Sequence, residues 1–330
     1  MHTQSYLVTG GTGFIGSALV QRLVQKGHRV RVIDNGWRGR SRRLKPVMKD
    51  IEMIKADIRD AKAVAKAAKG MDSIFHLAFI NGTEFFYTKP DLVLEVAVKG
   101  MINVLDAAIQ HGVKELFLAS SSEVYQTPAA IPTDESVALC IPDPLNPRYS
   151  YGAGKIISEM MALNYGRKHF ERVLIFRPHN VYGADMGCKH VLPQLTLRMK
   201  GLVQKSSKAN EVLRLMIQGT GKETRAFIYI DDFVDAVMFL AQKGTHLGIY
   251  HIGTMEEISI KEVAHKIARY FQRRIEIVSS EPAKGGTPRR CPDTRKITVL
   301  GFRPRYSFDE GLHLLIKWYD AHASGSRASP

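Results

Sequence analysis

Two residues four positions apart, Tyr151 and Lys155, are the first candidates for chemistry in this sequence. Residues i and i+4 share one face of a helix, so the phenol and the ammonium would lie close together. A phenol has a pKa of about 10, and it acts as a base near neutral pH only if that pKa falls by roughly 3 units. A nearby ammonium favours such a fall. Because ordinary surface helices show the same spacing, the pair needs support from elsewhere in the chain.

The segment SSSEVY, residues 120–125, gives part of that support because it directly follows an apolar run. Open α/β sheets bind their ligands at the carboxyl ends of strands. Three serines and Glu123 are costly to bury without hydrogen-bond partners. We therefore interpret the segment as part of a site, with an ordinary polar loop as the alternative.

A glycine-rich stretch, Gly10-x-x-Gly13-x-x-Gly16, lies between an apolar run and an amphipathic run. In this spacing the first glycine makes a tight turn, the second lets the backbone approach a phosphate, and the third packs helix against strand. Asp34 ends the next apolar run and can accept hydrogen bonds from an adenosine ribose, which favours NAD over NADP. The arginines that follow leave NADP open, because they could neutralise a 2′-phosphate: Arg38, Arg40, Arg42 and Arg43.

The elements that would position these residues alternate in type. β-Branched apolar runs predict strands at Tyr6–Thr9, Val30–Asp34, Ile51–Ala56, Ser73–Ala78, Glu115–Ser120 and Val173–Phe176. Amphipathic stretches predict helices at Gly16–Lys26, Ala61–Lys69, Leu92–His111 and Lys155–His169. This alternation predicts an α/β fold of the Rossmann type, a doubly wound parallel sheet with helices on both faces.

The pattern changes after Pro178, where loops lengthen and short elements mix. Strands are expected at Phe227–Tyr229 and Gly248–Ile252, and helices at Asp232–Gln242 and Ile260–Phe271. We expect residues 1–178 to form a dinucleotide-binding domain that includes the Tyr151 helix. Residues 179–320 would form mainly a smaller C-terminal substrate-binding lobe, with some segments returning to the sheet. The polar tail, residues 321–330, is expected to be flexible.

Composition narrows the class of protein. The chain has 330 residues, 45% of them hydrophobic, and three cysteines that fit neither a disulfide framework nor a zinc pattern. Without a signal peptide or a membrane-spanning run, we expect a soluble cytoplasmic protein. The net charge of +15 fits a basic surface or an anionic substrate. Because no nucleic-acid motif accompanies that charge, no nucleic-acid partner is expected. The histidines show no metal spacing, so no metal is expected either.

These motifs together resemble the extended short-chain dehydrogenase/reductases, in particular the NAD-dependent nucleotide-sugar epimerase/dehydratase group. The resemblance extends over about residues 5–318. It rests on TGGTGFIG, IDN, ADI, HLA, SSSEVY, the Tyr151-x-x-x-Lys155 pair, RPHNVYG, RAFIYIDD and RRCPD, in that order. It implies bound NAD, a nucleotide-sugar substrate and a homodimer formed by the helices at Leu92–His111 and Lys155–His169.

The resemblance also implies roles for individual residues. Tyr151 would take the proton of the sugar O4 beside Ser121 while NAD takes the C4 hydride, and Lys155 would hold the nicotinamide ribose. The catalytic set is then Ser121, Ser122, Glu123, Tyr151 and Lys155. The cofactor contacts are Gly10, Gly13, Phe14, Ile15, Gly16, Asp34, Asn35, Gly39, Arg40, Asp57, Ile58, Leu77, Ala78, Tyr151 and Lys155. The substrate contacts are Arg148, Asn180, Val191, Arg225 and Arg290, with Arg225 and Arg290 at the pyrophosphate.

A transient 4-keto sugar supports dehydration, decarboxylation or 4-epimerisation, and the fold does not choose among them. Glu123 favours chemistry at C5 or C6, since simple 4-epimerases of the group usually lack an acid there. Arg148 resembles an arginine of the decarboxylases that could meet a carboxylate. We therefore expect a dehydratase or a uronate decarboxylase. A 4-epimerase is the alternative, and an NAD-binding regulator without turnover is the alternative from another class. Two departures from the family stand out, Ala97 for an asparagine and Gln126 for a glycine.

Overall fold

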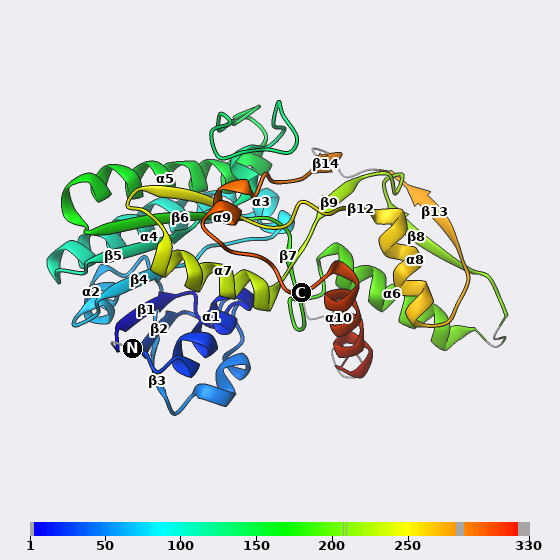
Figure 1. Ribbon diagram of the computed structural model, residues 1–330, viewed down its shortest axis with the longest axis horizontal. Helices are drawn as coiled ribbons and strands as arrows, with labels where there is room; N and C mark the ends of the chain where they lie inside the picture. The colour runs from blue at the N-terminus through cyan, green and yellow to red at the C-terminus, as the bar shows by residue number, and fades with distance from the viewer. Residues whose placement is uncertain (1–2, 207, 209, 282–286, 323–330) are drawn as a thin grey trace.

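A seven-stranded parallel sheet forms the centre of the computed structural model, which describes residues 3–206, 208, 210–281 and 287–322 (Figure 1). The strand order is β11-β6-β5-β4-β1-β2-β3. The strands are β1 Ser5–Thr9, β2 Arg29–Asp34, β3 Ile51–Lys55, β4 Ser73–His76, β5 Glu115–Ala119, β6 Arg172–Pro178 and β11 Gly248–Ile252. The expected doubly wound α/β fold is confirmed.

The sheet has a hydrophobic core on each face because successive side chains of a strand point to opposite sides. Leu7 of β1 belongs to the core beneath α2, α4 and α5, and its neighbour Val8 belongs to the core beneath α1 and α7. These helices are α1 Phe14–Gln25, α2 Ala61–Ala68, α4 Pro90–Gln110, α5 Ser150–His169 and α7 Ile230–Lys243. Both faces of the sheet are therefore covered.

Two element boundaries near the carboxyl edge of the sheet differ from expectation. The helix expected from Lys155 begins one turn earlier, at Ser150, so Tyr151 and Lys155 both lie on α5. The strand expected to reach Ala78 ends at His76. The hydroxyl of Thr9 accepts the backbone N–H of Ala78 across 3.1 Å, which takes that residue out of the strand ladder.

The second half of the chain builds smaller sheets to one side of the large one (Figure 1). Its strands are β7 Val181–Tyr182, β8 Leu213–Gln218, β9 Thr224–Ala226, β10 Ile228–Tyr229, β12 Glu257–Ser259, β13 Ile275–Ser280 and β14 Arg289–Arg290. Its further helices are α6 Val191–Lys205, α8 Ile260–Tyr270, α9 Arg295–Val299 and α10 Phe308–His322.

Three strands of the second half were not expected: β8, β9 and β13. The strand expected at Phe227–Tyr229 is observed as β10, Ile228–Tyr229, and the unexpected β9 precedes it and joins a different sheet. The strand expected at Gly248–Ile252 has those bounds as β11 and pairs with β6 in the large sheet. The parallel pair of β8 and β13 was missed. β8 buries alternate residues only, and its exposed positions include Met216, which obscured the period-two pattern.

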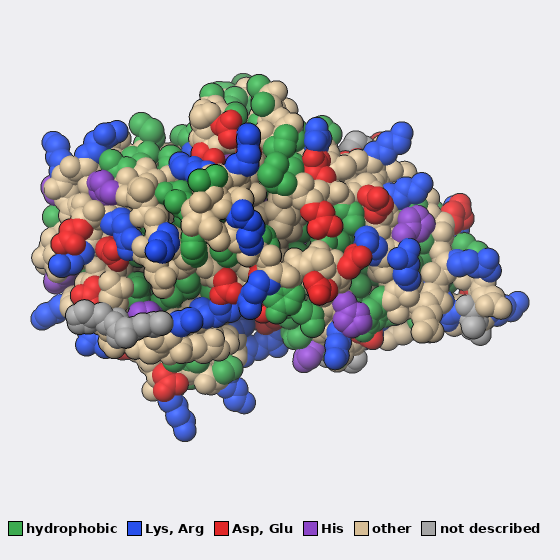
Figure 2. Space-filling view, viewed as in Figure 1, with side chains coloured by type: hydrophobic (Ala, Val, Ile, Leu, Met, Phe, Trp, Pro, Cys, Tyr) green, Lys and Arg blue, Asp and Glu red, His purple; other side chains and the backbone are tan. Residues whose placement is uncertain are grey.

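The surface carries its positive charge in scattered positions. On the face shown in Figure 2, lysines and arginines lie over both halves of the molecule and are interspersed with acids. Among the described helices, none combines the length and apolarity needed to cross a bilayer. The tail expected to be flexible falls mostly outside the described residues, since the description ends at His322.

Candidate active site

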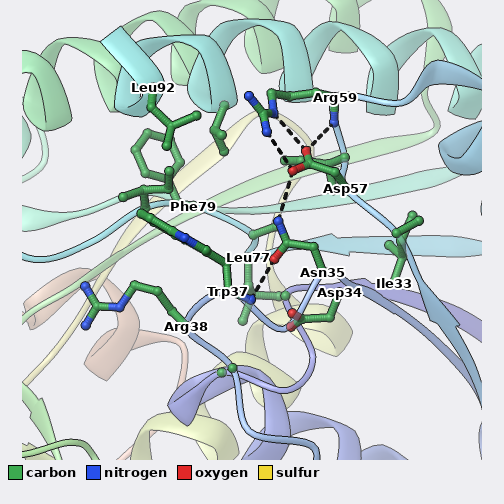
Figure 3. Close-up of a pocket in the computed structure, with 18 residues that line it drawn as sticks. Ile33, Asp34, Asn35, Trp37, Arg38, Asp57, Arg59, Leu77, Phe79 and Leu92 are labelled. Atoms are coloured by element: carbon green, nitrogen blue, oxygen red, sulfur yellow. Dashed lines mark hydrogen bonds and ion pairs between the residues drawn. The ribbon is translucent and has the colours of Figure 1, made fainter. Parts of the chain in front are cut away.

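A cleft lies at the carboxyl ends of strands β1 to β4 (Figure 3). Its lining includes the following residues predicted as cofactor contacts: Gly10, Gly13, Asp34, Asn35, Gly39, Asp57, Ile58, Leu77 and Ala78. Phe14, Ile15, Gly16 and Arg40 are outside that lining. Residues missed from the sequence also line it, among them Trp37, Arg38, Arg59, Phe79 and Leu92. Most of these follow strand ends by a few residues, which is the signal that could have found them.

The glycine-rich turn is shaped by close backbone contacts. A Cβ on Gly10, which has a φ of 73°, would lie 2.8 Å from Cα of Ala78, and a Cβ on Gly16 would lie 2.2 Å from the carbonyl oxygen of Gly10. Both positions therefore require glycine. The buried hydroxyl of Thr12 in this turn has no hydrogen-bond partner among the described residues. A tight turn that opens a helix and keeps a free donor fits the pyrophosphate of a dinucleotide.

The adenosine end of the cleft contains an acidic residue held by the backbone. Asp34 accepts from the N–H of Thr12 across 3.0 Å and from the N–H of Gly36 across 2.8 Å, and it is 9% exposed. Arg42 and Arg43, two of the arginines that left NADP open, instead form ion pairs with Asp185. The arrangement favours a ribose diol over a 2′-phosphate.

Asp57 closes the same end of the cleft. It accepts hydrogen bonds from Arg59 and from Asn35, the latter across 2.9 Å (Figure 3). The hydrogen bonds from Arg59 lower the pKa of Asp57 to about 2, against the opposing effect of burial. Because both carboxylate oxygens of Asp57 already accept hydrogen bonds from the protein, we assign Asp57 a structural role: it lines the cleft and holds the side chain of Asn35 in place.

Lys155 lies in a buried position beside the cleft. Its ammonium donates to the carbonyl oxygen of Ala119 across 2.7 Å and lies 3.8 Å from the centre of the Phe79 ring. Burial lowers the pKa of Lys155 to about 7, and the charge of Glu159 opposes that fall. Lys155 therefore ties helix α5 to the end of strand β5, just before the serines.

The surroundings of Tyr151 raise its pKa, whereas a base that acts near neutral pH needs a lowered one. Its ring stacks on Phe86 at 4.9 Å and meets Phe79 edge-on at 5.1 Å. Burial raises the pKa of Tyr151 to about 12, although a hydrogen bond from Ser121 acts in the opposite direction. The ammonium of Lys155 is 5.9 Å from the centre of the Tyr151 ring and is bound to Ala119 instead. Desolvation outweighs the charge that the sequence pattern placed nearby.

Glu123 forms an ion pair that the sequence did not predict. Nη1 of Arg290 donates to Oε1 of Glu123 across 2.8 Å. Burial by itself raises the pKa of Glu123, but Arg290, Arg148 and Arg225 together hold it below its ordinary value. The sequence assigned Arg290 to the pyrophosphate and Glu123 to the sugar, whereas the fold places the two in contact.

Of the remaining predicted substrate residues, Arg148 and Arg225 act electrostatically on Glu123. Arg225 donates to the carbonyl oxygen of Thr287 across 2.7 Å, and burial together with Arg290 lowers its pKa to about 10. Asn180 donates to the carbonyl oxygen of Ala226 across 2.8 Å. Val191 begins α6 and is partly buried. Nε of Arg148 is buried without a hydrogen-bond partner in the part of the chain described.

The two departures from the family pattern have local explanations. Gln126 has a φ of 52°, the left-handed conformation that a glycine would adopt easily, and its amide donates to the carbonyl oxygen of Glu123. Ala97 is buried where α4 meets α5, and a Cβ on Gly154 would lie 2.7 Å from its own Cβ. Neither residue displaces Tyr151 or Lys155 from α5.

These features define a class: a Rossmann-type enzyme fold with a dinucleotide cleft, a buried Tyr151 and Lys155, and a partly buried Ser121, as in the short-chain dehydrogenase/reductases. The chain belongs to the NAD dependent epimerase/dehydratase family, whose sequence model matches residues 6–253. Family members use NAD, and the cleft fits it. Within the described residues, no group of three or more histidines, cysteines or acids is placed to hold a metal ion.

Comparison with individual proteins places the chain among nucleotide-sugar enzymes. It is 30% identical over 325 residues to the UDP-N-acetyl-alpha-D-glucosaminuronate decarboxylase of Bacillus cytotoxicus, covering 95% of this chain and 97% of that one. The UDP-glucose 4-epimerase structure of Thermotoga maritima is 26% identical, with a TM-score of 0.84 and coverage of 97% and 100%. The dTDP-glucose 4,6-dehydratase of Streptomyces venezuelae, solved with NAD, is 28% identical, with a TM-score of 0.83 and coverage of 96% and 97%.

Proposed function

We propose that this protein decarboxylates a nucleotide-linked uronic acid through a transient 4-keto sugar. The observation that carries the proposal is the partly buried Glu123–Arg290 ion pair, whose carboxylate is also under the charge of Arg148 and Arg225. Three guanidinium groups and one carboxylate leave this part of the site positive, which suits a substrate with an anionic group on the sugar as well as its diphosphate. A substrate carboxylate would also give the buried Nε of Arg148 an acceptor.

The proposed roles follow from what each group touches. Bound NAD would supply the acceptor for the C4 hydride and would return that hydride to C4 after decarboxylation, so that no net oxidation results. Tyr151 takes the O4 proton with Ser121 at the same oxygen, while Lys155 holds α5 against β5. A ketone at C4 lies β to the C6 carboxylate. The C5–C6 bond can then break, its electron pair moving to the keto oxygen as carbon dioxide leaves, and C5 is protonated afterwards. Because Glu123 is ionised, it acts through its negative charge rather than as a proton donor.

The two halves of the chain divide this work. Residues 1–178 would hold the dinucleotide and carry Tyr151. Residues 179–320 would bind the nucleotide, with Asn180, Val191 and Arg225 near its diphosphate and base. A cytoplasmic location accords with three free thiols, those of Cys140, Cys188 and Cys291.

A homodimer accords with exposed apolar side chains on the two helices that the family resemblance points to. On α4 and α5 these side chains are 37% to 52% exposed: Leu94, Ile102, Ile109, Ile157 and Met160. The two helices pack against each other, so a second copy could bury all five in a four-helix arrangement.

One incubation in heavy water tests the function. The purified protein, without added cofactor, is given UDP-, GDP-, CDP- and dTDP-linked sugars and uronates, and the products are read by mass spectrometry and NMR. We expect loss of carbon dioxide with deuterium at C5. Loss of water would mean dehydration, and an isobaric product without deuterium would mean 4-epimerisation, which the resemblance to the Thermotoga enzyme supports. Binding without any product would indicate a regulator.

A further inference from the structure

Asp185 connects the two halves of the molecule close to the dinucleotide cleft. It lies between β7 and α6, and its carboxylate accepts from Nε of Arg43 across 3.0 Å and from Nη2 of Arg42 across 3.0 Å. Its carbonyl oxygen accepts from Nη2 of Arg43 across 2.5 Å. Arg43 belongs to η1, the 3-10 helix Ser41–Val47 that follows the arginine-rich loop. One acid therefore receives three hydrogen bonds from a segment 142 positions earlier in the chain.

The same arginine also reaches the glycine-rich turn. Nη1 of Arg43 donates to the carbonyl oxygen of Thr12 across 3.2 Å, and the N–H of Arg40 donates to that oxygen across 2.9 Å. Thr12 lies between Gly10 and Gly13, whose backbone lines the cleft. Arg43 thus forms a continuous hydrogen-bonded path from the dinucleotide turn to Asp185.

Burial and backbone conformation indicate that this connection is specific. The side chain of Arg43 is 11% exposed and that of Asp185 is 19% exposed, whereas Arg42 is 59% exposed. Asp185 has a φ of 55°, a conformation that is uncommon outside glycine and persists where the surroundings hold it in place. The hydrogen bonds to both its side chain and its carbonyl oxygen provide that restraint.

We propose that Arg43 and Asp185 couple dinucleotide binding to nucleotide-sugar binding. Six residues after Asp185, Val191 begins α6, where the nucleoside is proposed to lie. A dinucleotide that orders the glycine-rich turn orders Arg43, and Arg43 orders the loop that leads to α6. The coupling acts equally in the other direction, because linkage between two binding sites is reciprocal. The inference rests on the proposed function, since it requires a nucleotide in the second lobe.

A second ion pair from the same loop provides a matched control. Lys189 contacts Glu84 on α3, the helix Thr83–Thr88, and these two side chains are 64% and 49% exposed. Water and salt screen such a pair, so it contributes little. Both pairs join the same two parts of the molecule, but only Arg43–Asp185 touches the glycine-rich turn.

The test is calorimetric titration of the full chain, first freed of any dinucleotide that copurifies with it, with NAD, alone and with whichever of UDP, dTDP, GDP or CDP binds. In the wild type we expect the nucleoside diphosphate to tighten NAD binding by roughly 5- to 150-fold. In Asp185→Asn that factor should fall to near one, while each ligand alone binds as in the wild type. Asparagine tolerates the left-handed conformation as aspartate does, and it removes the negative charge together with one of the two side-chain oxygens that accept from Arg42 and Arg43. Arg43→Gln should behave alike, and Glu84→Gln should keep the full factor.

The outcomes separate this inference from the proposed function. If both ligands bind the wild type without influencing each other, or if Asp185→Asn and Arg43→Gln keep the full factor, the coupling is overturned and the proposed function stands. If none of the four nucleoside diphosphates binds the wild type, the proposed function fails and the inference falls with it. If Glu84→Gln also loses the coupling, then any contact between the two halves contributes to it. That result also overturns the specific role of Arg43 and Asp185.

Discussion

The guanidinium of Arg290 is hydrogen-bonded to the carboxylate of Glu123, although 167 positions separate them in the sequence. The pair joins the 3-10 helix η2, Ser122–Val124, to the short strand β14. The carboxylate of Glu123, paired with the guanidinium of Arg290, thus lies two residues after Ser121, which is proposed to bind the sugar. The reaction that follows oxidation at C4 depends on this pair if the proposed function is correct.

Replacing Glu123 by glutamine should lower kcat for decarboxylation by about 10²- to 10³-fold, the range found when one electrostatic group at a reacting centre is removed. The neutral amide keeps the shape but leaves Arg290 beside Arg148 and Arg225 without a counter-charge. The matched control is Glu257→Gln, because Glu257 pairs with the adjacent Arg289, whose side chain is 51% exposed. Unchanged turnover in Glu123→Gln would remove the support for C5 or C6 chemistry.

The same variant has a predicted pH signature in stability. The folded protein holds the pKa of Glu123 below its ordinary value of 4.5, so its ionised form stabilises the fold above that pH. This contribution is lost as the pH falls through the lowered pKa. The difference in free energy of unfolding between wild type and Glu123→Gln should therefore be constant near neutral pH and shrink below about pH 4.5. Urea denaturation at several pH values measures it.

Removing the hydroxyl of Ser121 should move the pH profile of the reaction. Burial raises the pKa of Tyr151 to about 12, and the hydrogen bond from Ser121 works against that rise. In Ser121→Ala the acid limb of kcat/KM should shift to higher pH and kcat should fall at least about tenfold. Ser150→Ala serves as the comparison, since its buried hydroxyl has no partner among the described residues. An unshifted limb would mean that Ser121 does not act on Tyr151.

Replacing Glu159 by glutamine should shift the basic limb of the pH profile of kcat/KM. Glu159 accepts hydrogen bonds from Arg177 across 2.6 Å and 2.9 Å, and its charge raises the pKa of Lys155 against burial. Without that charge the pKa of Lys155 falls further below about 7. The ammonium is then lost at lower pH, so activity should decline earlier as the pH rises.

A second carboxylate serves as the control for that experiment. Glu135 accepts a hydrogen bond from the N–H of His251, whereas Glu159 acts on Lys155. Glu135→Gln should therefore leave the basic limb of the pH profile unchanged. The free energy of unfolding of the wild type provides a second measurement. Because burial lowers the pKa of Lys155 to about 7, the folded state releases a proton and wild-type stability should rise with pH above that value.

Asp34→Asn should weaken NAD binding by about tenfold or more, because a charge-assisted hydrogen bond to the ribose is lost. It should also reduce the rejection of NADP, since the carboxylate no longer repels a 2′-phosphate. Fluorescence titration with NADH and NADPH measures both effects. The control is Glu52→Gln, an exposed acid on the neighbouring strand that pairs with Arg31. A ratio of affinities equal to that of the wild type would contradict the role assigned to Asp34.

Charges introduced on the outer face of α5 should produce monomers. Ile157 is 45% exposed and Met160 is 52% exposed, so substitution by glutamate leaves the monomer core intact and disfavours an apolar contact between copies. Sedimentation velocity should show a dimer for the wild type and a monomer for Ile157→Glu with Met160→Glu. Val299→Glu, at an exposed apolar residue (84%) on α9, is the control. A wild type that sediments as a monomer would contradict the proposed dimer.

The sequence by itself determined what depends on local pattern. Alternating apolar runs and amphipathic stretches fixed the parallel sheet, because strands and helices bury their side chains with different periods. Two further patterns are short-range: the spacing of Gly10, Gly13 and Gly16, and the i to i+4 relation of Tyr151 and Lys155. They predict local structure even where the overall course of the chain is predicted incorrectly. Position after a strand was enough to place Ser121 and Asp34 at the carboxyl edge of the sheet.

Only the tertiary structure decided which distant groups meet and how deeply each is buried. The contacts of Glu123 with Arg290 and of Arg43 with Asp185 each join segments more than 140 positions apart, and no periodicity specifies such a pairing. The burial of Tyr151, which raises the pKa of its phenol, depends on tertiary packing for a related reason. A pattern shows that a lysine is near, but desolvation by Phe79 and Phe86, which depends on packing from other elements, has the larger effect on the phenol.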